Sequence, residues 1–374
     1  MLFYIGIFLF LICFLVLDFV KDGQSIKSFL FYLLVLSFVF LGGIRWETGT
    51  DWNNYYSLFN RSGSENAVEN ETTFEIGFRY FNFLARKITD SYTVFLLVSG
   101  LFIILTKSAY LKNNTKYFFL ALFLYYAYFF CDVFFVRQSI AISLTLVSTT
   151  YIVKRKFIPF SLIIAGASLF HSSAVLFIIA YFVYSWKIPT TVIVIAVLLS
   201  ILYMAMGLDT VVFKFLAPRL GFNEFIANRL NEYLEKGKES TFGSNVSKTT
   251  ILILGVFKRG LLLPLFLWVR ANIEREKKVE FNGYLNLVVL GTILFFLTAG
   301  FVALQRVITY FAFYEILLLL MVVGYLHKRI SIPIIYFFLI LYAFSKFYYG
   351  FAGYKDLYVP YYSIFDSKIN RRDY

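Results

Sequence analysis

The stretch Phe157–Trp186 reads FIPFSLIIAGASLFHSSAVLFIIAYFVYSW, and it decides the fold that this sequence predicts. A helix needs about 20 apolar residues to cross the hydrocarbon core of a bilayer. Thirty residues are too many for one comfortable crossing and too few for two full ones. We therefore expect two short helices, 157–170 and 173–186, that meet at His171-Ser172-Ser173 in a protein-lined, water-accessible cavity, because polar groups at membrane depth are costly and usually functional.

The composition of the whole chain agrees with a membrane protein. Of its 374 residues 60% are hydrophobic and only 15% are charged, which excludes an ordinary soluble domain. The formal net charge of +13 would suggest a nucleic-acid partner in a soluble chain. Here many basic residues sit at the ends of apolar runs, where they act as topology signals, so no nucleic-acid partner is implied.

Two further features of the sequence bear on processing and cofactors. The apolar run at residues 2–17 lacks a basic leading region and a small-residue cleavage site, so we interpret it as a retained first helix. Cys13 and Cys131 lie in or beside apolar runs, where a thiol behaves as a small hydrophobe. They indicate neither a disulfide framework nor a metal site.

Apolar runs and basic clusters together predict an all-α polytopic protein with about twelve transmembrane helices. Basic clusters at six junctions then fall on one face, which should be cytoplasmic: 21–27, 112–116, 154–156, Lys187, 270–278 and Lys328-Arg329. The predicted spans are 2–20, 27–44, 92–111, 117–132, 134–153, 157–170, 173–186, 189–206, 250–269, 282–302, 306–326 and 331–349.

This topology makes residues 1–374 a single integral membrane domain with its elaborate loops on the opposite, extracytoplasmic face. Those loops are 45–91 and 207–249, with short turns at 132–136 and 303–306 and an aromatic tail, 350–374, that we expect to fold back over the outer face. One alternative stays open. If 157–186 were a single tilted crossing, every later element would change sides, and the basic residues of loop 207–249 are compatible with that topology.

Within the first loop, the segment Thr73–Ile88 has helical periodicity. Phe74, Phe78, Phe81 and Leu84 or Ala85 fall on one side, opposite Glu75, Arg79, Asn82 and Arg86. This pattern predicts an amphipathic helix that lies in the plane of the membrane interface and covers the outer mouth of the bundle.

Two charges of opposite sign flank a glycine-rich turn at the end of the second predicted span. Arg45 follows Gly42-Gly43-Ile44, and Asp51 follows Thr48-Gly49-Thr50. The structural interpretation is that Asp51 caps a short helix, that Trp52 and Tyr55 anchor at the interface, and that Arg45 snorkels. The functional interpretation is that both charges line the mouth of a cavity.

Arg137-Gln138 follows Cys131-Asp132 across a sharp turn between two apolar helices, and Arg137 lies about one turn inside its span. A guanidinium at that depth must find a carboxylate, a carbonyl or an anionic ligand. An internal Asp132–Arg137 ion pair is one solution. Binding of a substrate diphosphate is the other, because arginine matches phosphate oxygens in a bidentate manner.

His171 is either a structural histidine satisfied by Ser172 and Ser173 or a proton acceptor at a buried, wet apex, since imidazole titrates near neutral pH. The one other histidine, His327, lies beside Lys328-Arg329 on the predicted cytoplasmic face, so a metal site is not expected. Lys258-Arg259 interrupts a span, and Gln305-Arg306 opens another. Basic residues there favour an anionic ligand inside the bundle.

With these motifs in place, the chain resembles the EpsG-like branch of the Wzy-type O-antigen and exopolysaccharide polymerases. The motifs occur in the family's order over most of the chain, and the region 187–250 adds almost nothing. They are Gly43-x-Arg45 with Gly49-Thr50-Asp51-Trp52-x-x-Tyr55, Glu75-x-Gly77-Phe78, Arg137-Gln138-x-x-Ala141, His171-x-Ser173-Ala174, Arg306-x-x-x-Tyr310 and Pro360-Tyr361.

The resemblance implies a GT-C-like glycosyltransferase in the bacterial plasma membrane, with short or broken helices around an extracytoplasmic cavity. Such an enzyme joins undecaprenyl-diphosphate-linked oligosaccharides into a surface polysaccharide, such as that of lipopolysaccharide, without a metal or other cofactor, and a chain-length regulator protein is a further partner that it allows. His171 is then the first candidate for the base, with Asp51 and Glu75 as alternates. Arg45, Arg137, Gln138, Lys258, Arg259, Arg306 and Tyr310 would bind diphosphate or glycan.

Two other classes of protein compete with a polymerase. A flippase for lipid-linked glycans would also line a cavity with arginines, but its cationic site must open to both faces, whereas the polar residues here crowd one face. Lys258 and Arg259 are the exception and would favour transport if the cytoplasm reached them. A membrane O-acyltransferase would also use an intramembrane histidine, but the predicted cytoplasmic turns look too short to hold a site for its acyl donor.

Overall fold

The computed structural model describes residues 1–134, 136–208, 211–212, 215, 248–299, 302–352 and 355–366. Over this part of the chain the regular structure is helical, and Arg45 and Ser363 form an isolated β-bridge. Seven of its helical segments are long and apolar enough to cross a membrane, and four shorter helices are also apolar. The prediction of an all-α polytopic membrane protein is therefore confirmed, while the number of about twelve spans stays a prediction.

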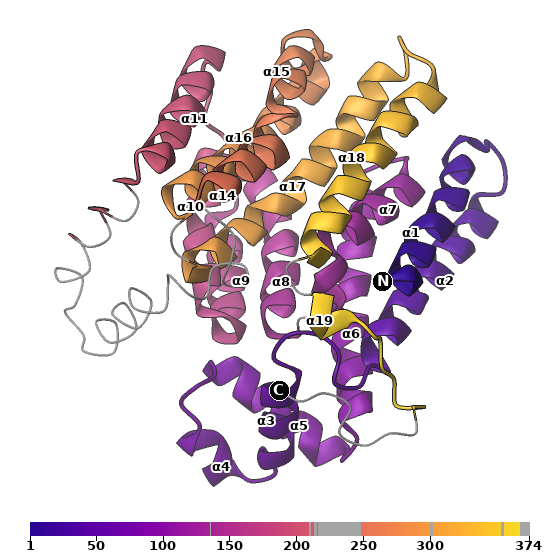
Figure 1. Ribbon diagram of the computed structural model, residues 1–374, viewed down its shortest axis with the longest axis vertical. Helices are drawn as coiled ribbons and strands as arrows, with labels where there is room; N and C mark the ends of the chain where they lie inside the picture. Colours follow the sequence, from indigo (N-terminus) through magenta and orange to yellow (C-terminus); the bar gives the residue numbers. More distant parts are fainter. Residues whose placement is uncertain are drawn as a thin grey trace. The chain divides into compact units, whose positions relative to one another are not determined.

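The described chain divides into two compact units. The first comprises Met1–Val175 with Ile330–Tyr374, and the second comprises Leu176–Arg329. The helices of the first unit are α1 (Leu2–Phe14), η1 (Leu15–Phe19), α2 (Gln24–Gly43), α3 (Trp52–Arg61), α4 (Glu65–Asn70), α5 (Ile76–Ile88), α6 (Tyr92–Asn113), α7 (Phe118–Phe129), η2 (Phe130–Phe134), α8 (Val136–Val153), α9 (Phe157–Phe170), α18 (Ile332–Ala352) and α19 (Lys355–Tyr358) (Figure 1). Those of the second are α10 (Ile179–Val183), α11 (Thr190–Ala205), α14 (Lys248–Gly255), η4 (Val256–Gly260), α15 (Leu263–Asn272), α16 (Arg275–Leu297) and α17 (Val302–Leu326), and η3 (Ser172–Ile178) runs from one into the other. That residues 1–374 form one integral membrane domain stays a prediction.

The predicted break at His171 is confirmed. Helix α9 ends at Phe170, and His171 takes an extended backbone, with φ −153° and ψ 110°. The second half differs from the expected regular helix 173–186, because it begins as the 3-10 helix η3 and continues as the five-residue α10. A break of this kind leaves backbone groups that must find partners inside the protein.

A second irregularity falls on Lys258-Arg259. The predicted span 250–269 is covered by α14, α15 and the intervening π-helix η4, which carries both basic residues. The guanidinium of Arg259 lies over the ring of Phe295, 4.5 Å from its centroid. Single-turn π-helices occur frequently at functional sites, so the two residues stay candidates for ligand binding.

Two of the predicted outer segments, the loop 207–249 and the turn 303–306, have different outcomes. The loop 207–249 lies almost entirely outside the described residues. The turn predicted at 303–306 is wrong, because α17 begins at Val302 and already contains Gln305. The amide of Gln305 donates to the carbonyl oxygen of Phe295 (3.2 Å) and lies 3.3 Å from the hydroxyl of Thr298, so it satisfies the end of α16 from within the next helix.

The described part of the C-terminal tail folds back, as predicted, and its partner is the segment after α2. Trp46 N–H donates to the Tyr362 carbonyl, and Gly49 N–H donates to that of Leu357, both at 2.9 Å. The hydroxyl of Tyr4 donates to the carbonyl of Tyr358 at 2.8 Å, which ties the first helix to the same tail. Which face of the membrane this cluster occupies stays a prediction.

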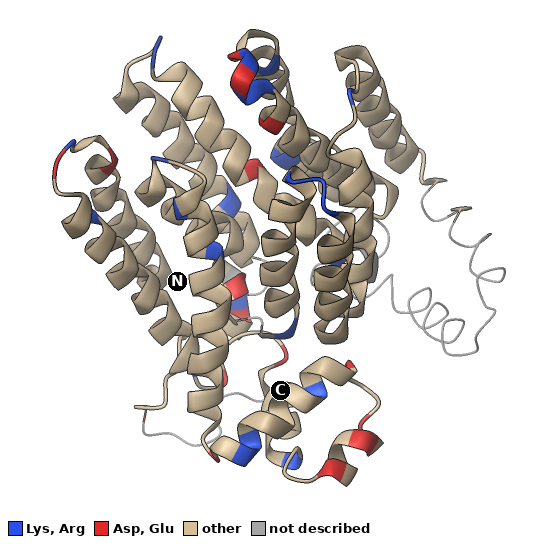
Figure 2. Cartoon of the chain, turned by 180° about the vertical axis from the view of Figure 1, so that it is seen from behind, with Lys and Arg blue, Asp and Glu red and all other residues tan. Residues whose placement is uncertain are grey.

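Helices α3, α4 and α5 are not among the candidate membrane spans, and we call them together the extramembrane segment; its place outside the membrane stays a prediction. Charged residues occur on this segment and near the ends of the long helices (Figure 2). The helix predicted at 73–88 exists as α5, and its place in the membrane interface stays a prediction. Of the predicted apolar side, Phe78 is buried and its ring contacts that of Tyr55, whereas Leu84 is 59% exposed. Asn82, from the predicted polar side, is fully buried, because α5 also has apolar residues outside the predicted side and exposes some of them.

The helices of the first unit pack against one another, and at the contact between α5 and α9 they approach closely enough to require glycine. Helix α2 packs on α6, α6 on α8, α8 on α9 and α7 on α18, and the extramembrane helix α5 packs on the end of α9 (Figure 1). At that contact a Cβ on Gly77 would lie 2.7 Å from Cβ of Leu169 and 2.8 Å from its carbonyl oxygen. By contrast, a Cβ on Gly166, in the middle of α9, would meet nothing within 4 Å.

We predict that Gly77→Ala lowers the thermal stability of the purified protein, because the added methyl group must push α5 away from α9, at a cost of about 1–3 kcal/mol. The matched control, Gly166→Ala, should leave stability unchanged or raise it by up to about 1 kcal/mol, since alanine favours a helix more than glycine does. The measurement is the monodisperse fraction left after heating in detergent. Equal melting points for the two variants would contradict the close approach of α5 and α9.

Candidate functional site

Glu75 is the centre of the candidate site, because its carboxylate joins three segments of the first unit. It immediately precedes α5 and has an extended backbone, which directs its side chain away from its own helix. One oxygen, Oε2, accepts a hydrogen bond from Arg137 Nη1 at 2.8 Å. The other, Oε1, accepts from the Ser172 N–H at 3.0 Å and lies 3.3 Å from the Ser172 hydroxyl. The carboxylate therefore satisfies the first N–H after the break between α9 and η3.

Arg137 lies in the first turn of α8, as the sequence indicated, and its partner is Glu75. The predicted alternative, an Asp132–Arg137 pair, is wrong, because Asp132 is taken by Lys107. Only 15% of the Arg137 side chain is exposed, and its guanidinium lies 5.3 Å from the centroid of the Phe74 ring. Its Nε is buried without a hydrogen-bond partner. The guanidinium thus has at least one donor that no protein group satisfies.

His171 is buried beside this pair, at 6% exposure. Its Nδ1 lies 2.7 Å from the hydroxyl of Ser173, so Ser173 orients the ring, and its positive form would interact favourably with the carboxylate of Glu75. The structure thus brings His171, Glu75 and Arg137 together. Gln138 follows on α8 and is half-buried.

The charge state of Glu75 follows from its neighbours. Burial alone would raise the pKa of its carboxyl group. The guanidinium of Arg137, the N–H of Ser172 and the interaction with His171 outweigh burial and hold the pKa below its ordinary value of 4.5. Glu75 is therefore an ionised acceptor at neutral pH, which suits it to hold and orient cationic groups better than to act as a general acid.

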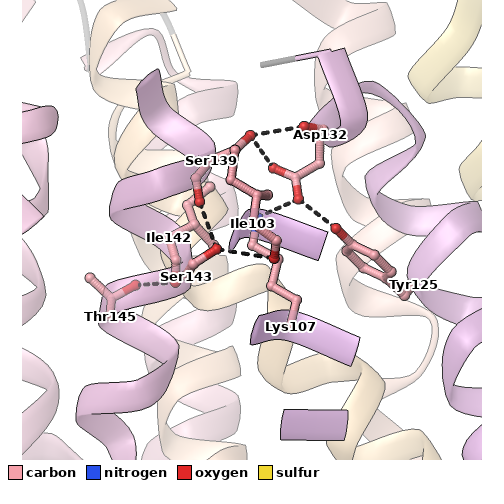
Figure 3. A network of polar contacts seen from close by, with 8 residues as sticks. All are labelled: Ile103, Lys107, Tyr125, Asp132, Ser139, Ile142, Ser143 and Thr145. Atoms are coloured by element: carbon pink, nitrogen blue, oxygen red, sulfur yellow. Dashed lines mark hydrogen bonds and ion pairs between the residues drawn. The ribbon is translucent and has the colours of Figure 1, made fainter. Parts of the chain in front are cut away.

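Asp132 belongs to a separate network that holds the turn before Arg137 (Figure 3). Its carboxylate is paired with Lys107 of α6, accepts from the hydroxyl of Tyr125 at 2.9 Å, and lies 2.5 Å from the hydroxyl of Ser139. The ammonium of Lys107 and the carboxylate are both almost completely buried. Because Ser139 lies two residues after Arg137, this network fixes the start of α8 from both sides of the arginine. Lys107, Tyr125 and Ser139 are positioning residues rather than ligands.

The sequence carries one signal for this network, which is Lys107 itself. It is a lone lysine within the apolar run 92–111, and a charge in such a run needs an interior partner. Spacing along the chain favours Arg137 as the partner of Asp132, because only five residues separate them. The true partner of Asp132 is Lys107, twenty-five residues earlier in the chain. The sequence indicates it only because a lysine is costly to bury without a partner.

Arg45 and Asp51 flank the turn that the C-terminal tail covers. Arg45 is 1% exposed, donates from Nη1 to the carbonyl of Val133 at 3.2 Å, and lies 5.5 Å from the ring centroid of Phe134. Its Nε and Nη2 are buried without partners. Asp51 is exposed at the start of α3, in a left-handed backbone conformation, 3.5 Å from the amide of Asn54. Trp52 and Tyr55, expected as interfacial anchors, are instead buried in the extramembrane segment.

The remaining predicted ligands belong to the second unit. Lys258 and Arg259 lie on η4, and Arg306 and Tyr310 lie on α17, where Arg306 is exposed and Tyr310 is buried. These four residues and Glu75 belong to different units, and their part in binding stays a prediction. Among the described residues, no three histidine, cysteine or acidic side chains lie close enough together to hold a metal ion.

Lys107→Met should lower the free energy of unfolding by about 3–5 kcal/mol, because it leaves the carboxylate of Asp132 buried without its cation. Replacement of both partners, Lys107→Met with Asp132→Leu, should recover part of this loss. The control Lys112→Met removes a lysine of the same helix that donates to the hydroxyl of Ser28 at 2.8 Å and lies over three aromatic rings. It should have a smaller effect, because its hydrogen-bond partner is a neutral hydroxyl and no buried carboxylate loses its cation. Melting points of the four proteins in detergent test the coupling. A double variant no more stable than Lys107→Met would refute a net burial cost of the lone carboxylate.

The lowered pKa of Glu75 gives a second prediction. Since folding depresses this pKa, the ion pair contributes stability that is present above the ordinary value of 4.5 and is lost as the pH falls through the lowered one. The melting point of the wild type should therefore fall toward that of Glu75→Gln only in the acid range. Melting curves of both proteins from neutral pH downward provide the test. A constant difference at every pH would mean that the ionised form is not preferred in the folded state.

One family of known proteins matches most of the chain. Its sequence model, described as the EpsG family, matches residues 28–363. That range includes Glu75, Arg137, His171 and every other candidate residue. No curated protein and no solved structure matches the chain.

Proposed function

The chain belongs to the EpsG family, and from that premise we propose that it is a polysaccharide polymerase of the bacterial plasma membrane. It joins oligosaccharide repeat units carried on undecaprenyl diphosphate, by glycosyl transfer at the outer face, without a metal ion. The observation that carries this proposal is the grouping of Arg137, Glu75 and His171 at a helix break beside the extramembrane helices. A cation with spare donors and an imidazole on one carboxylate suit the departure of a diphosphate and the activation of a hydroxyl.

In the proposed reaction, a sugar hydroxyl of one lipid-linked unit attacks the anomeric carbon of the growing glycan. A new carbon–oxygen bond forms, and the bond from that carbon to the diphosphate breaks, so the electron pair leaves with the polyprenyl diphosphate. His171 accepts the hydroxyl proton. Arg137 stabilises the charge that develops on the diphosphate. A fixed cation in a site from which water is excluded does this without having to reorient during the reaction.

Glu75 has an orienting role in this proposal. It is ionised and already accepts three hydrogen-bond contacts, from Arg137 and from the N–H and hydroxyl of Ser172. It therefore places the guanidinium and stabilises the imidazolium that forms, which is a better use of it than as the base itself. Asp51, which is exposed, remains the alternate base. Arg45, Gln138, Lys258, Arg259, Arg306 and Tyr310 remain proposed contacts to diphosphate or glycan.

Arg137→Ala and His171→Ala should each lower polymer formation by about 100-fold or more, in line with the loss of a charge-stabilising donor or of a general base. Surface glycan from cells that carry each variant should collapse from a ladder to a single repeat unit on a gel. Lys116→Ala is the control, because it removes an exposed cation before α7, outside the site. Wild-type chain lengths in both variants would refute the assignment.

The ion pair is also structural, so loss of polymer must be separated from loss of protein. The exchange variant Glu75→Arg with Arg137→Glu should restore more of the melting point than either single change does, because the pair can form again. It should not restore polymer, since the cation then sits on the wrong segment.

Gene deletion decides between the two classes of function. A ladder that collapses to one unit supports a polymerase, whereas complete loss, with lipid-linked units kept inside the cell, supports a flippase.

A further inference from the structure

Helix α5 exposes an apolar face although it lies in an extramembrane segment. Of its five exposed residues, Lys87 alone is charged, and the other four recur every fourth position. Residues spaced by four share one side of a helix. The four apolar residues, which we call the α5 row, are Ile76 (49% exposed), Tyr80 (37%), Leu84 (59%) and Ile88 (85%).

The neighbouring helices provide an internal comparison. In α3 and α4 every exposed residue is polar or charged. These are Asn53, Asn54, Ser57, Asn60 and Arg61 in α3, and Glu65, Asn66, Glu69 and Asn70 in α4. The three helices belong to one folded segment, and only α5 exposes apolar side chains. We therefore expect the exposed side of α5 to have different surroundings from those of α3 and α4.

The α5 row begins beside the exposed apolar side of α9. Gly77, next to the first residue of the row, packs against Leu169 near the end of the apolar helix α9. Leu169 is itself 48% exposed, and Leu162 and Ile158 on the same helix are exposed by 68% and 72%. Exposed apolar side chains along a membrane helix contact acyl chains. The row therefore prolongs the lipid-facing side of α9 onto the extramembrane segment.

We infer that α5 lies in the membrane interface, with the α5 row in the acyl region of the leaflet and the polar surfaces of α3 and α4 in water. An apolar helix face with an adjacent lysine is typical of helices that bind in this way. Lys87 is exposed and lies 5.1 Å from the ring centroid of Phe83, where it can reach lipid phosphates.

The position of Glu75 gives this surface a function, which rests on the proposed polymerase activity. Glu75 immediately precedes Ile76, the first residue of the row, and α5 begins there. Insertion of the row therefore fixes the Glu75–Arg137 pair at the depth of the lipid headgroups. The diphosphate of a lipid-linked glycan lies at that depth, while its glycan extends into water. The α5 row thus holds the site at the same depth in the membrane as the diphosphate.

The test uses spin labels on single cysteines in full-length protein reconstituted into phospholipid nanodiscs, with both native cysteines replaced by serine. One label is placed at Leu84 in the row and the matched control at Asn66 on α4. Oxygen concentrates in the acyl region, and a water-soluble nickel chelate is excluded from it. Collision with oxygen should exceed collision with nickel severalfold at position 84, and the order should reverse at position 66.

The other outcomes overturn the inference. High nickel accessibility at position 84 would place the row in water. Low accessibility to both reagents would mean that protein, such as a second copy of the chain, covers it. The measurement does not depend on catalysis, so it stands even if gene deletion leaves surface glycan unchanged.

A second arm tests the depth of the site. Leu84→Asp with Ile88→Asp should move a label at Thr73, two residues before Glu75, toward higher nickel accessibility and shorten the glycan ladder. Asn66→Asp should do neither. A ladder of wild-type length, in protein whose label at Thr73 has moved, would show that depth does not matter for the site.

Discussion

The ion pair between Lys107 and Asp132 is the interaction on which the first unit depends. Inside a bilayer neither charge can be hydrated, so each must be satisfied by protein, and the pair joins α6 to the turn that leads into α8. Tyr125 adds α7 to the same carboxylate. The adjacent carbonyl of Val133 accepts from Arg45, which ties the segment after α2 to that turn as well. A buried polar centre that is fully bonded fixes one arrangement of helices where apolar packing alone would allow several.

Glu75 connects the extramembrane segment to these helices. Its carboxylate connects the start of α5 to Arg137 on α8 and to Ser172 after the break in α9. The close packing of Gly77 on Leu169 holds the same two helices, α5 and α9, together beside this carboxylate. The candidate site is therefore built on rigid elements: the network around Asp132 positions Arg137 from inside the bundle, and α5 positions Glu75 from outside it.

The sequence predicted what depends on local composition. Apolar runs and basic turns located the helices, and the excess length of 157–186 located the break at His171, because both follow from the thickness of a bilayer. What depends on tertiary partners was predicted less well. One of the two alternatives for Arg137 pairs it with its neighbour Asp132, although the partners are Lys107 for Asp132 and Glu75 for Arg137. In α5 the predicted apolar side includes Phe78, which is buried, but also Leu84, which is exposed, because periodicity cannot tell which apolar residues the protein buries and which it exposes. Asn82, placed on the polar side, is buried, and its amide donates to the carbonyl of Phe78 one turn earlier in the helix.

The charges at the site explain why a carboxylate belongs in a site proposed to bind a diphosphate. Without substrate, Arg137 and Glu75 compensate each other, so a guanidinium that is 15% exposed has its counterion and costs less to bury than an unpaired one. In the proposed reaction His171 takes up a proton as the diphosphate leaves. The trio of Arg137, Glu75 and His171 then gains one positive charge at the step in which negative charge develops on the leaving group. A fixed arginine attracts the diphosphate more strongly as negative charge develops on it, and the new imidazolium adds to that gain. The imidazolium, which the carboxylate stabilises, makes the attraction grow as the bond breaks, and only interactions that are stronger in the transition state than in the ground state accelerate a reaction.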